Sequence, residues 1–160
     1  MSKYILLSSI INNKDIDDIV KNILDMTSSL KKYYPEYESW FMNKHIPGIY
    51  LDTRNTILLM INNDIVGICN VKYEEKKICT LFIKEEYQNK GMVKELINEA
   101  INLLKVTDPL ITIPKSVIYK YESIIKKLNW KLIESIDNYY VEGSTELVYN
   151  RNIDGGRTWI

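Results

Sequence analysis

The stretch from residue 81 to residue 104 changes its hydrophobic period abruptly, and no other feature constrains the fold as strongly. Three consecutive apolar residues at positions 81–83 are typical of a buried strand. A polar turn follows, and beyond Gly91 the apolar residues recur every three or four positions up to Leu104, which is the spacing of an amphipathic helix. A strand that leads through a tight turn into a helix predicts a layered α/β domain.

The start of this helix has the properties of an anion-binding site. The first backbone N–H groups of a helix have no partner within it, and the helix dipole adds positive potential at the same end. A glycine lets a diphosphate approach the backbone closely, a lysine adds charge and a glutamine amide can donate a hydrogen bond. We therefore predict a pyrophosphate-binding turn made of Gln88, Asn89, Lys90, Gly91, Met92 and Val93. The alternative is that the glycine only relieves a tight turn.

The rest of the chain alternates strand and helix patterns. Period-two or short apolar runs predict strands at residues 4–8, 57–61, 65–71, 78–83, 110–113, 130–136 and 145–149. Helical spacing predicts helices at residues 16–24, 33–41, 93–104 and 116–128, with Ser116 as a cap and Pro47-Gly48 breaking the aromatic second helix. We expect an α/β domain with a mostly antiparallel mixed sheet and helices on both faces, over residues 1–150, followed by a tail at residues 151–160.

Composition excludes several classes of function. The 160 residues fit one domain, and 21 basic residues balance 21 acidic ones, which disfavours nucleic-acid and membrane-surface partners. No apolar run approaches the roughly 20 residues needed to span a bilayer, so we expect a cytoplasmic protein. Cys69 and Cys79 have no metal-ligand spacing and read as buried thiols, and His45 is the sole histidine. We expect no metal.

The turn and its surroundings resemble the GNAT superfamily of N-acetyltransferases. Members of that family carry Arg/Gln-x-x-Gly-x-Gly/Ala between the fourth strand and the following helix. Gln88 and Gly91 match the first two positions, whereas Val93 stands where glycine or alanine is usual. The order of elements from Tyr4 to Tyr149 is also similar, and the last strands resemble those of small bacterial GNAT-domain proteins.

The resemblance implies a specific ligand and reaction. Acetyl-CoA would lie with its pyrophosphate on the turn and its pantetheine arm beside the strand, whose backbone groups would pair with it: Leu81, Phe82 and Ile83. The acetyl group would pass directly to a primary amine of a small molecule or peptide in a ternary complex, without a metal. A homodimer is left open. The alternatives are a catalytically weak acyl-CoA-binding module or sensor, and a domain that binds another phosphorylated ligand.

The catalytic residues depart from the family pattern. Alignment on Asn129-Trp130 places Ile125 where the family has a tyrosine that protonates the sulfur, and Tyr121, one helical turn earlier, is the replacement candidate. Core packing is the alternative for Tyr121, and Tyr119 is a weaker candidate. Lys77 takes the place of a glutamate base found in some members. His45 could act as a base, but we expect a surface histidine.

Aromatic residues gather in two places. One group could form the wall of an acceptor site or simply pack in the core: Tyr33, Tyr34, Tyr37, Trp40 and Phe41. Tyr139 and Tyr140, before the last strand, carry the same two interpretations.

Overall fold

The computed structural model describes residues 2–153, which form one seven-stranded sheet with helices on both faces. The strands are β1 Ser2–Leu6, β2 Arg54–Ile61, β3 Asp64–Lys72, β4 Lys77–Ile83, β5 Leu110–Pro114, β6 Leu132–Asp137 and β7 Thr145–Tyr149. The α-helices are α1 Ile16–Met26, α2 Tyr37–Trp40, α3 Ile46–Tyr50, α4 Met92–Leu104 and α5 Glu122–Lys127. Shorter helical turns are η1 Leu7–Ser9, η2 Ser28–Lys32, η3 Phe41–His45, η4 Glu85–Tyr87 and η5 Lys115–Lys120. The predicted fold class, a mostly antiparallel mixed sheet between helices, is confirmed.

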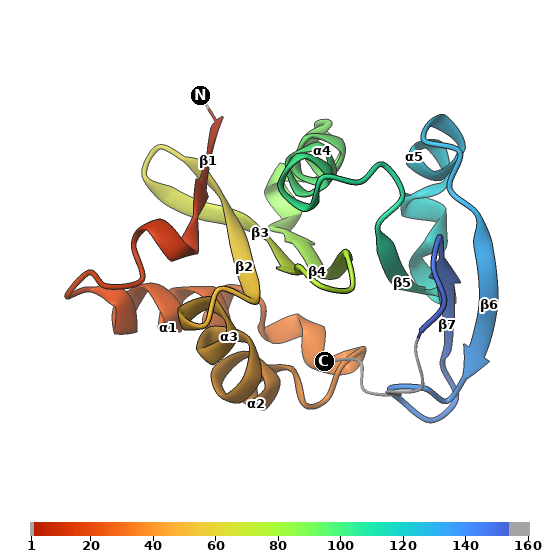
Figure 1. Cartoon of the computed structure of the whole chain (residues 1–160), viewed down its shortest axis with the longest axis horizontal. Helices are drawn as coiled ribbons and strands as arrows, with labels where there is room; N and C mark the ends of the chain where they lie inside the picture. Colours follow the sequence, from red (N-terminus) through yellow and green to blue (C-terminus); the bar gives the residue numbers. More distant parts are fainter. Residues whose placement is uncertain (1, 154–160) are drawn as a thin grey trace.

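The strand order is β1-β2-β3-β4-β5-β7-β6, and β4 and β5 are the parallel neighbours. Tight turns join β2 to β3, where Asn62 and Asn63 adopt positive φ of 51° and 69°, a conformation that asparagine tolerates. Parallel strands need a crossover, and α4 supplies it. The pairing of β4 with β5 is confined to Lys77↔Leu110 and Ile78↔Ile111, so the two strands separate beyond this point. Figure 1 shows β1–β4 on one side of this separation and β5–β7 on the other.

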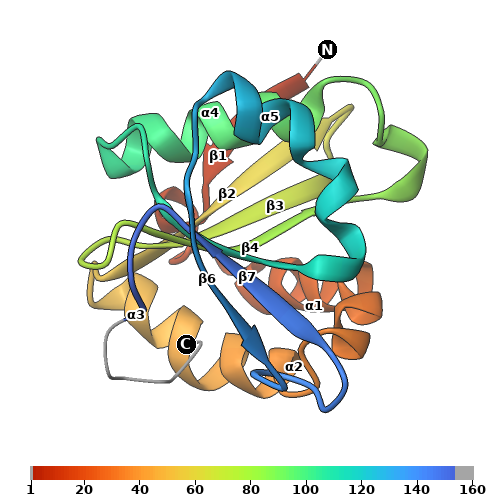
Figure 2. The same cartoon turned by 90° about the vertical axis from the view of Figure 1, so that its right-hand side faces the viewer.

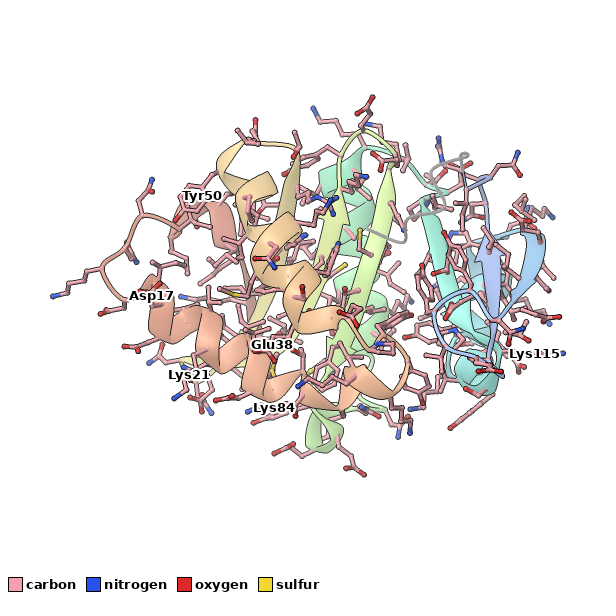
Figure 3. All side chains as sticks on the ribbon, turned by 90° about the horizontal axis from the view of Figure 1, so that it is seen from below. Asp17, Lys21, Glu38, Tyr50, Lys84 and Lys115 are labelled. Carbon is pink, nitrogen blue, oxygen red and sulfur yellow. The ribbon has the colours of Figure 1, made fainter. Side chains whose placement is uncertain are left out.

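Two apolar cores lie on opposite faces of the sheet. Helices α4 and α5 cover one face and α1–α3 the other (Figures 1 and 2). The inward stripe of α4 is fully buried and consists of Leu96, Ile97, Ala100 and Leu104. On the opposite face α1 buries Val20 and Ile23, while its charged residues Asp17 and Lys21 lie outside, as Figure 3 shows from below. Burial of each large aliphatic side chain contributes roughly 1.5–3 kcal/mol to the free energy of folding. The apolar stripes of α1 and α4 therefore hold these helices on the sheet.

The aromatic segment continues through Pro47 and Gly48, so the predicted break there is wrong. Helix α2 leads into the π-helical turn η3 and then into α3, with proline in the first turn of α3. A Cβ on Gly48 would lie 2.5 Å from Cδ of Arg54, so the glycine makes room for the arginine.

The predicted helix that begins at Ser116 is divided in two. Residues 115–120 form the 3-10 helix η5, and α5 begins at Glu122 with Tyr121 at its N-cap. Ser116 therefore does not cap an α-helix. The amide of Ile125 donates to the carbonyl of Tyr121 over 2.9 Å, so the predicted i to i+4 relation between these residues holds.

The described part of the tail packs back onto the domain. Arg151 forms an ion pair with Asp108 at 3.1 Å, and the predicted tail beyond residue 153 lies outside the described residues. Among residues 2–153, each helix is too short or too polar to cross a membrane.

Candidate active site

A cavity of about 610 Å³ opens where β4 and β5 separate. Its lining comes from η2 and the residues after it, from β4, from the turn before α4, from β5 and from η5. Most of the residues predicted to contact CoA lie along it: Leu81, Phe82, Ile83, Gln88, Asn89 and Val93. The structure thus brings the predicted strand and the predicted turn together on one hollow. Lys90, Gly91 and Met92 complete the turn from which α4 begins.

The edge of β4 that faces the cavity carries unpaired backbone groups. In an antiparallel pair, successive residues direct their N–H and C=O groups alternately toward and away from the partner strand. The amide of Lys84 donates to the carbonyl of Val66 in β3 over 2.9 Å, so the backbone groups of Ile83 and Leu81 face away from β3. In the described part of the chain, no strand pairs with these groups beyond the two paired positions of β5. Apart from the Ile83 carbonyl, which accepts from Gln88, they can pair with an extended ligand as an added strand would.

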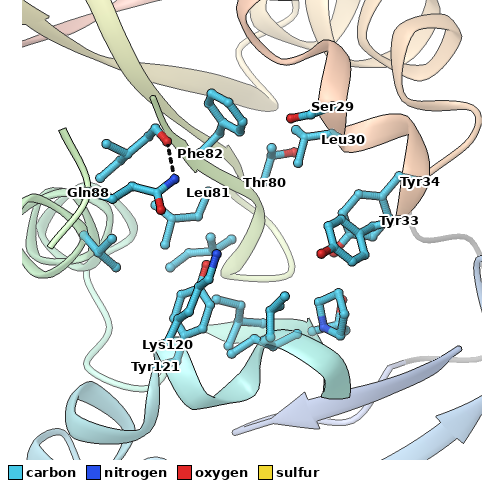
Figure 4. Close-up of a pocket in the computed structure, with 18 of the residues that line it drawn as sticks. Ser29, Leu30, Tyr33, Tyr34, Thr80, Leu81, Phe82, Gln88, Lys120 and Tyr121 are labelled. Atoms are coloured by element: carbon cyan, nitrogen blue, oxygen red, sulfur yellow. Dashed lines mark hydrogen bonds between the residues drawn. The ribbon is translucent and has the colours of Figure 1, made fainter. Parts of the chain in front are cut away.

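Gln88 closes the end of this edge. Its side-chain Nε2 donates to the carbonyl oxygen of Ile83 over 2.8 Å, which Figure 4 shows as a dashed line. The predicted free amide at the turn is therefore engaged with the strand. The bond also shows that the Ile83 carbonyl points into the cavity.

The first turn of α4 is open and could accept an anion. Gly91 is the N-cap with φ 80° and ψ 2°, and a Cβ built on it would meet no atom within 4 Å. The space over the helix start is therefore open, and no side-chain cap occupies its N–H groups. Lys90 lies nearby, with Nζ 6.0 Å from the centre of the Tyr87 ring. The residues present thus fit a diphosphate followed by an extended arm along β4.

The aromatic segment divides between the core and the cavity. Tyr37, Trp40 and Phe41 are almost fully buried, so for them the packing interpretation is correct. Tyr33 and Tyr34 line the cavity, and in Figure 4 they lie on the side opposite Gln88. The ring of Tyr34 meets that of Tyr140 edge-on at 5.0 Å, and Tyr139 lies 4.5 Å from Tyr140. Tyrosines from both predicted groups therefore meet at one end of the cavity.

Tyr121 lines the same cavity as β4 and the α4 turn, near Lys120 in Figure 4. Burial raises the pKa of its hydroxyl to about 12, and the nearby Cys69 and Tyr33 add to the rise. The hydroxyl is therefore a proton donor throughout the neutral range. Ile125, which we aligned with the tyrosine of the family pattern, packs on the core around Trp130. Tyr119 also lines the cavity but is 65% exposed.

The prediction that His45 lies on the surface is wrong. Its side chain is fully buried between α2 and β2, stacked on Phe41 at 5.4 Å. The Thr56 hydroxyl donates to Asn70 and accepts from Nε2 of His45 over 2.8 Å. Burial, and then the positive charge of Arg54, lowers the pKa of His45 to about 3. His45 does not line the cavity, so the structure gives it no access to a substrate there.

Sequence reasoning missed one buried acid beside the cavity. Glu146 on β7 is 2% exposed, and burial raises its pKa to about 8 although the Thr112 hydroxyl and Lys77 oppose the rise. Thr112 lines the cavity one residue beyond the last β4–β5 pair. The signal in the sequence was a single glutamate within a strand whose next three residues are apolar, and we read it only as part of the strand pattern.

The cysteines show no sign of covalent or metal chemistry. Cys69 and Cys79 are free thiols, and burial raises the pKa of both. Across the described residues no group of three or more His, Cys, Asp or Glu side chains is arranged to hold a metal ion.

Comparisons with known proteins agree with this geometry. The model of the acetyltransferase (GNAT) domain matches residues 31–118, which is more than half of the chain. A protein from Desulfovibrio desulfuricans assigned to the GNAT acetyltransferases superposes with a TM-score of 0.65 at 10% identity, covering 93% of this chain and 97% of the other. One from Staphylococcus epidermidis, assigned as an acetyltransferase, gives a TM-score of 0.64 at 17% identity with the same coverage.

A further solved structure contains the ligand that such domains use. A GNAT-family acetyltransferase from Elizabethkingia anophelis, solved with acetyl-CoA bound, gives a TM-score of 0.52 at 15% identity over 67% of this chain and 81% of the other. Among curated proteins no significant sequence match was found. The matched domain, the separated β4 and β5 strands and the open turn at Gly91 together show that this chain belongs to the GNAT family of acetyltransferases.

Proposed function

We propose that this chain transfers an acetyl group from acetyl-CoA to a primary amine of a small molecule or peptide, in one ternary complex. The observation that carries the proposal is that a single cavity runs from the β4 edge and the α4 turn to the tyrosines on its opposite side. Such a cavity can hold a donor and an acceptor at the same time. Direct transfer gains from this proximity because both reactants are already oriented.

The parts of the cavity have distinct roles in this proposal. The N–H groups at the start of α4 and the charge of Lys90 bind the pyrophosphate, while the backbone of Leu81 and Ile83 holds the pantetheine arm. A backbone N–H of this strand polarises the thioester carbonyl. Tyr121 donates a proton to the departing sulfur, because its raised pKa keeps the hydroxyl protonated at neutral pH. The raised pKa values of Cys69 and Cys79 disfavour a thiol intermediate.

Two classes of acceptor are suggested by solved relatives. A protein of this fold from Arabidopsis thaliana was solved with a bisubstrate analogue that joins CoA to the peptide Met-Val-Asn-Ala-Leu. A Bacillus anthracis relative assigned as a streptothricin acetyltransferase was solved with acetyl-CoA. We therefore propose peptide amino termini and cationic small molecules as the first acceptors to test.

Binding of acetyl-CoA is tested by thermal unfolding. Saturating acetyl-CoA should raise the melting temperature of the wild type, because a ligand at 100 times its Kd stabilises the folded state by about 2.7 kcal/mol. Gly91→Glu should lose this shift, since the added carboxylate would occupy the open space over the α4 turn and repel the pyrophosphate. The matched control is Gly143→Glu, because Gly143 also has positive φ and open space but lies in the loop between β6 and β7 and not at the start of α4. An equal shift in Gly91→Glu and the wild type would remove the pyrophosphate assignment.

Catalysis is tested separately from binding. The wild type is incubated with acetyl-CoA and spermidine, kanamycin or the peptide Met-Val-Asn-Ala-Leu, and free CoA thiol is measured. Thiol release that depends on the amine supports the transferase. Acetyl-CoA binding without amine-dependent release would favour the alternative, an acyl-CoA-binding module with weak catalysis, which the isoleucine at position 125 and the valine at position 93 also suggest.

A further inference from the structure

Glu146 is a buried acid whose carboxyl group has only part of its hydrogen-bonding capacity used. It lies on β7 between Pro114 of β5 and Ile136 of β6, and its side chain is 2% exposed. Among residues 2–153, its Oε2 atom has no hydrogen-bond partner. Buried carboxylate oxygens without a partner are costly and uncommon. A buried acid with one unpaired oxygen beside a cavity points to a ligand or a proton that this oxygen binds.

The surroundings of Glu146 connect it to the cavity. The Thr112 hydroxyl donates to its carboxylate, and Thr112 itself lines the cavity. Tyr34, another lining residue, and Tyr140 both lie close enough for the Glu146 charge to raise their pKa values. The hydroxyl of Tyr140 is 3.4 Å from Oγ1 of Thr112. Glu146 therefore lies directly behind the residues that line the cavity near Tyr34.

Thr112 also lies at the position where a reacting acetyl group is expected. The strands β4 and β5 are paired up to Ile78↔Ile111, and Thr112 is the next residue. A pantetheine arm that pairs with the free edge of β4 would place its acetyl end near the point where β4 and β5 pair. The proton pathway from Thr112 to Glu146 thus begins at the junction between the donor part of the cavity and the tyrosines.

We infer that Glu146, reached through the Thr112 hydroxyl, accepts the proton that an acceptor ammonium must lose before acetyl transfer. The inference rests on the proposed function and narrows its acceptor to amines that bind as cations. The tyrosine rings around the carboxylate support this choice, because an ammonium is stabilised both by a nearby negative charge and by aromatic faces.

The proton and electron balance of the step is complete. The ammonium gives one N–H proton to Oγ1 of Thr112 while the Thr112 hydroxyl proton passes to Glu146, which leaves a neutral amine and a carboxylic acid. The amine lone pair forms the C–N bond to the acetyl carbon, and the C–S bond breaks with its electrons on sulfur. Tyr121 gives its hydroxyl proton to the thiolate and takes the second N–H proton from the new amide nitrogen in return. Glu146 then loses its proton to solvent, so the products are the amide, the CoA thiol and one proton.

The acid–base properties of Glu146 suit a proton acceptor near neutral pH. Burial raises its pKa to about 8, while the Thr112 hydroxyl and the positive Lys77 on β4 oppose the rise. The other titratable groups that face it are Tyr34 and Tyr140, and their own pKa values are raised, so they stay neutral in this range. A base whose pKa lies near the working pH combines an adequate ionised fraction with strong proton affinity.

The test compares two pairs of variants in the full chain. Glu146→Gln and Thr112→Val remove the proton acceptor and the relay hydroxyl. Glu134→Gln on the exposed face of β6 is the control, and Thr112→Ser, which keeps the hydroxyl, is the rescue variant. For the best acceptor among spermidine, kanamycin and the peptide, kcat/KM should fall by about 100-fold or more in the first two and by less than about threefold in Glu134→Gln, and Thr112→Ser should recover most of the rate that Thr112→Val loses. The Kd of acetyl-CoA, measured by calorimetry, should stay within about twofold in all four, because the α4 turn is unchanged.

The pH profile and a binding readout complete the test. The wild-type kcat/KM should rise with pH through a step near 8 as Glu146 ionises, and this step should be absent in Glu146→Gln. A Glu146→Gln variant that retains wild-type rates and the same profile would overturn the inference. If acetyl-CoA binds but no amine is acetylated, the proposed function fails. In that case the ¹³C NMR chemical shift of the Glu146 carboxyl carbon is measured with and without spermidine. A change would support an interaction between Glu146 and the amine, and no change would overturn the inference together with the proposed function.

Discussion

At the scale of single residues, burial decided the chemistry of the ionisable groups. In the sequence, neither His45 nor Glu146 has neighbours that indicate burial of its side chain. In the structure both are almost fully excluded from water. The same desolvation acts in opposite directions on them, because it disfavours the charged form of each: it lowers the pKa of the histidine and raises that of the acid. Neither shift could be inferred from neighbouring positions in the chain.

The depressed pKa of His45 predicts acid sensitivity. The unfolded chain binds a proton at this histidine below about pH 6.5, whereas the folded protein keeps it neutral down to about 3. The unfolded state therefore binds more protons in this window, and stability is lost as the pH falls through it. Between pH 7 and 4.5 the wild type should lose roughly 2–3 kcal/mol more of its unfolding free energy than His45→Gln, as urea denaturation would measure.

Because His45 is the sole histidine, the difference between these two proteins has one source. The carboxylates, including Glu146, contribute equally to both proteins and cancel in the comparison. Equal pH dependence in the two proteins would mean that His45 can bind a proton in the folded state.

At the scale of elements, the junction between η5 and α5 is what places Tyr121 beside β4. The sequence pattern predicts one continuous helix from Ser116, but the chain forms a 3-10 helix first and starts α5 only at Glu122. The proposed acid therefore sits at a helix start and lines the cavity, while Ile125, one turn later, packs in the core. A displaced tyrosine can in this way serve the same cavity as one at the usual family position.

Tyr121→Phe tests whether this tyrosine is the acid. Loss of the hydroxyl should lower kcat by about tenfold to 100-fold where sulfur protonation limits the rate, and should leave the Kd of acetyl-CoA within about twofold. The control is Tyr119→Phe, because that side chain lines the cavity but is 65% exposed. Steady-state kinetics with the best amine measure both variants. A kcat of Tyr121→Phe within a factor of two of the wild type would end the assignment.

At the scale of the whole molecule, the sheet has two parts joined by little pairing. Strands β1–β4 form one part and β5–β7 the other, and the register pairs between them are Lys77↔Leu110 and Ile78↔Ile111. The helix α4 and the shared core around Trp130 supply the remaining connection. Separation of β4 from β5 opens the cavity and also leaves the seam between the two parts weakly hydrogen-bonded.

A ligand that bridges this seam should change amide exchange on both sides. We expect saturating acetyl-CoA to slow hydrogen–deuterium exchange by roughly tenfold or more in β4, in the first turn of α4 and in β5, because a ligand bound between the strands suppresses their local opening. Mass spectrometry of the wild type and Gly91→Glu measures this protection, and the variant should show none. Protection limited to α4 would indicate that the ligand does not lie between the strands.

The amino-acid sequence by itself determined the elements whose signal is local. The period-two and helical spacings predicted β4, α4 and β7 almost to the residue, and the glycine at the strand-helix junction predicted where α4 begins, because these patterns depend on neighbours in the chain. The tertiary structure alone decided which side chains share the cavity. It divided the aromatic segment between core and cavity, buried His45 and placed Glu146 behind Thr112. Burial and cross-strand register join residues far apart in the chain, and local patterns carry no information about them.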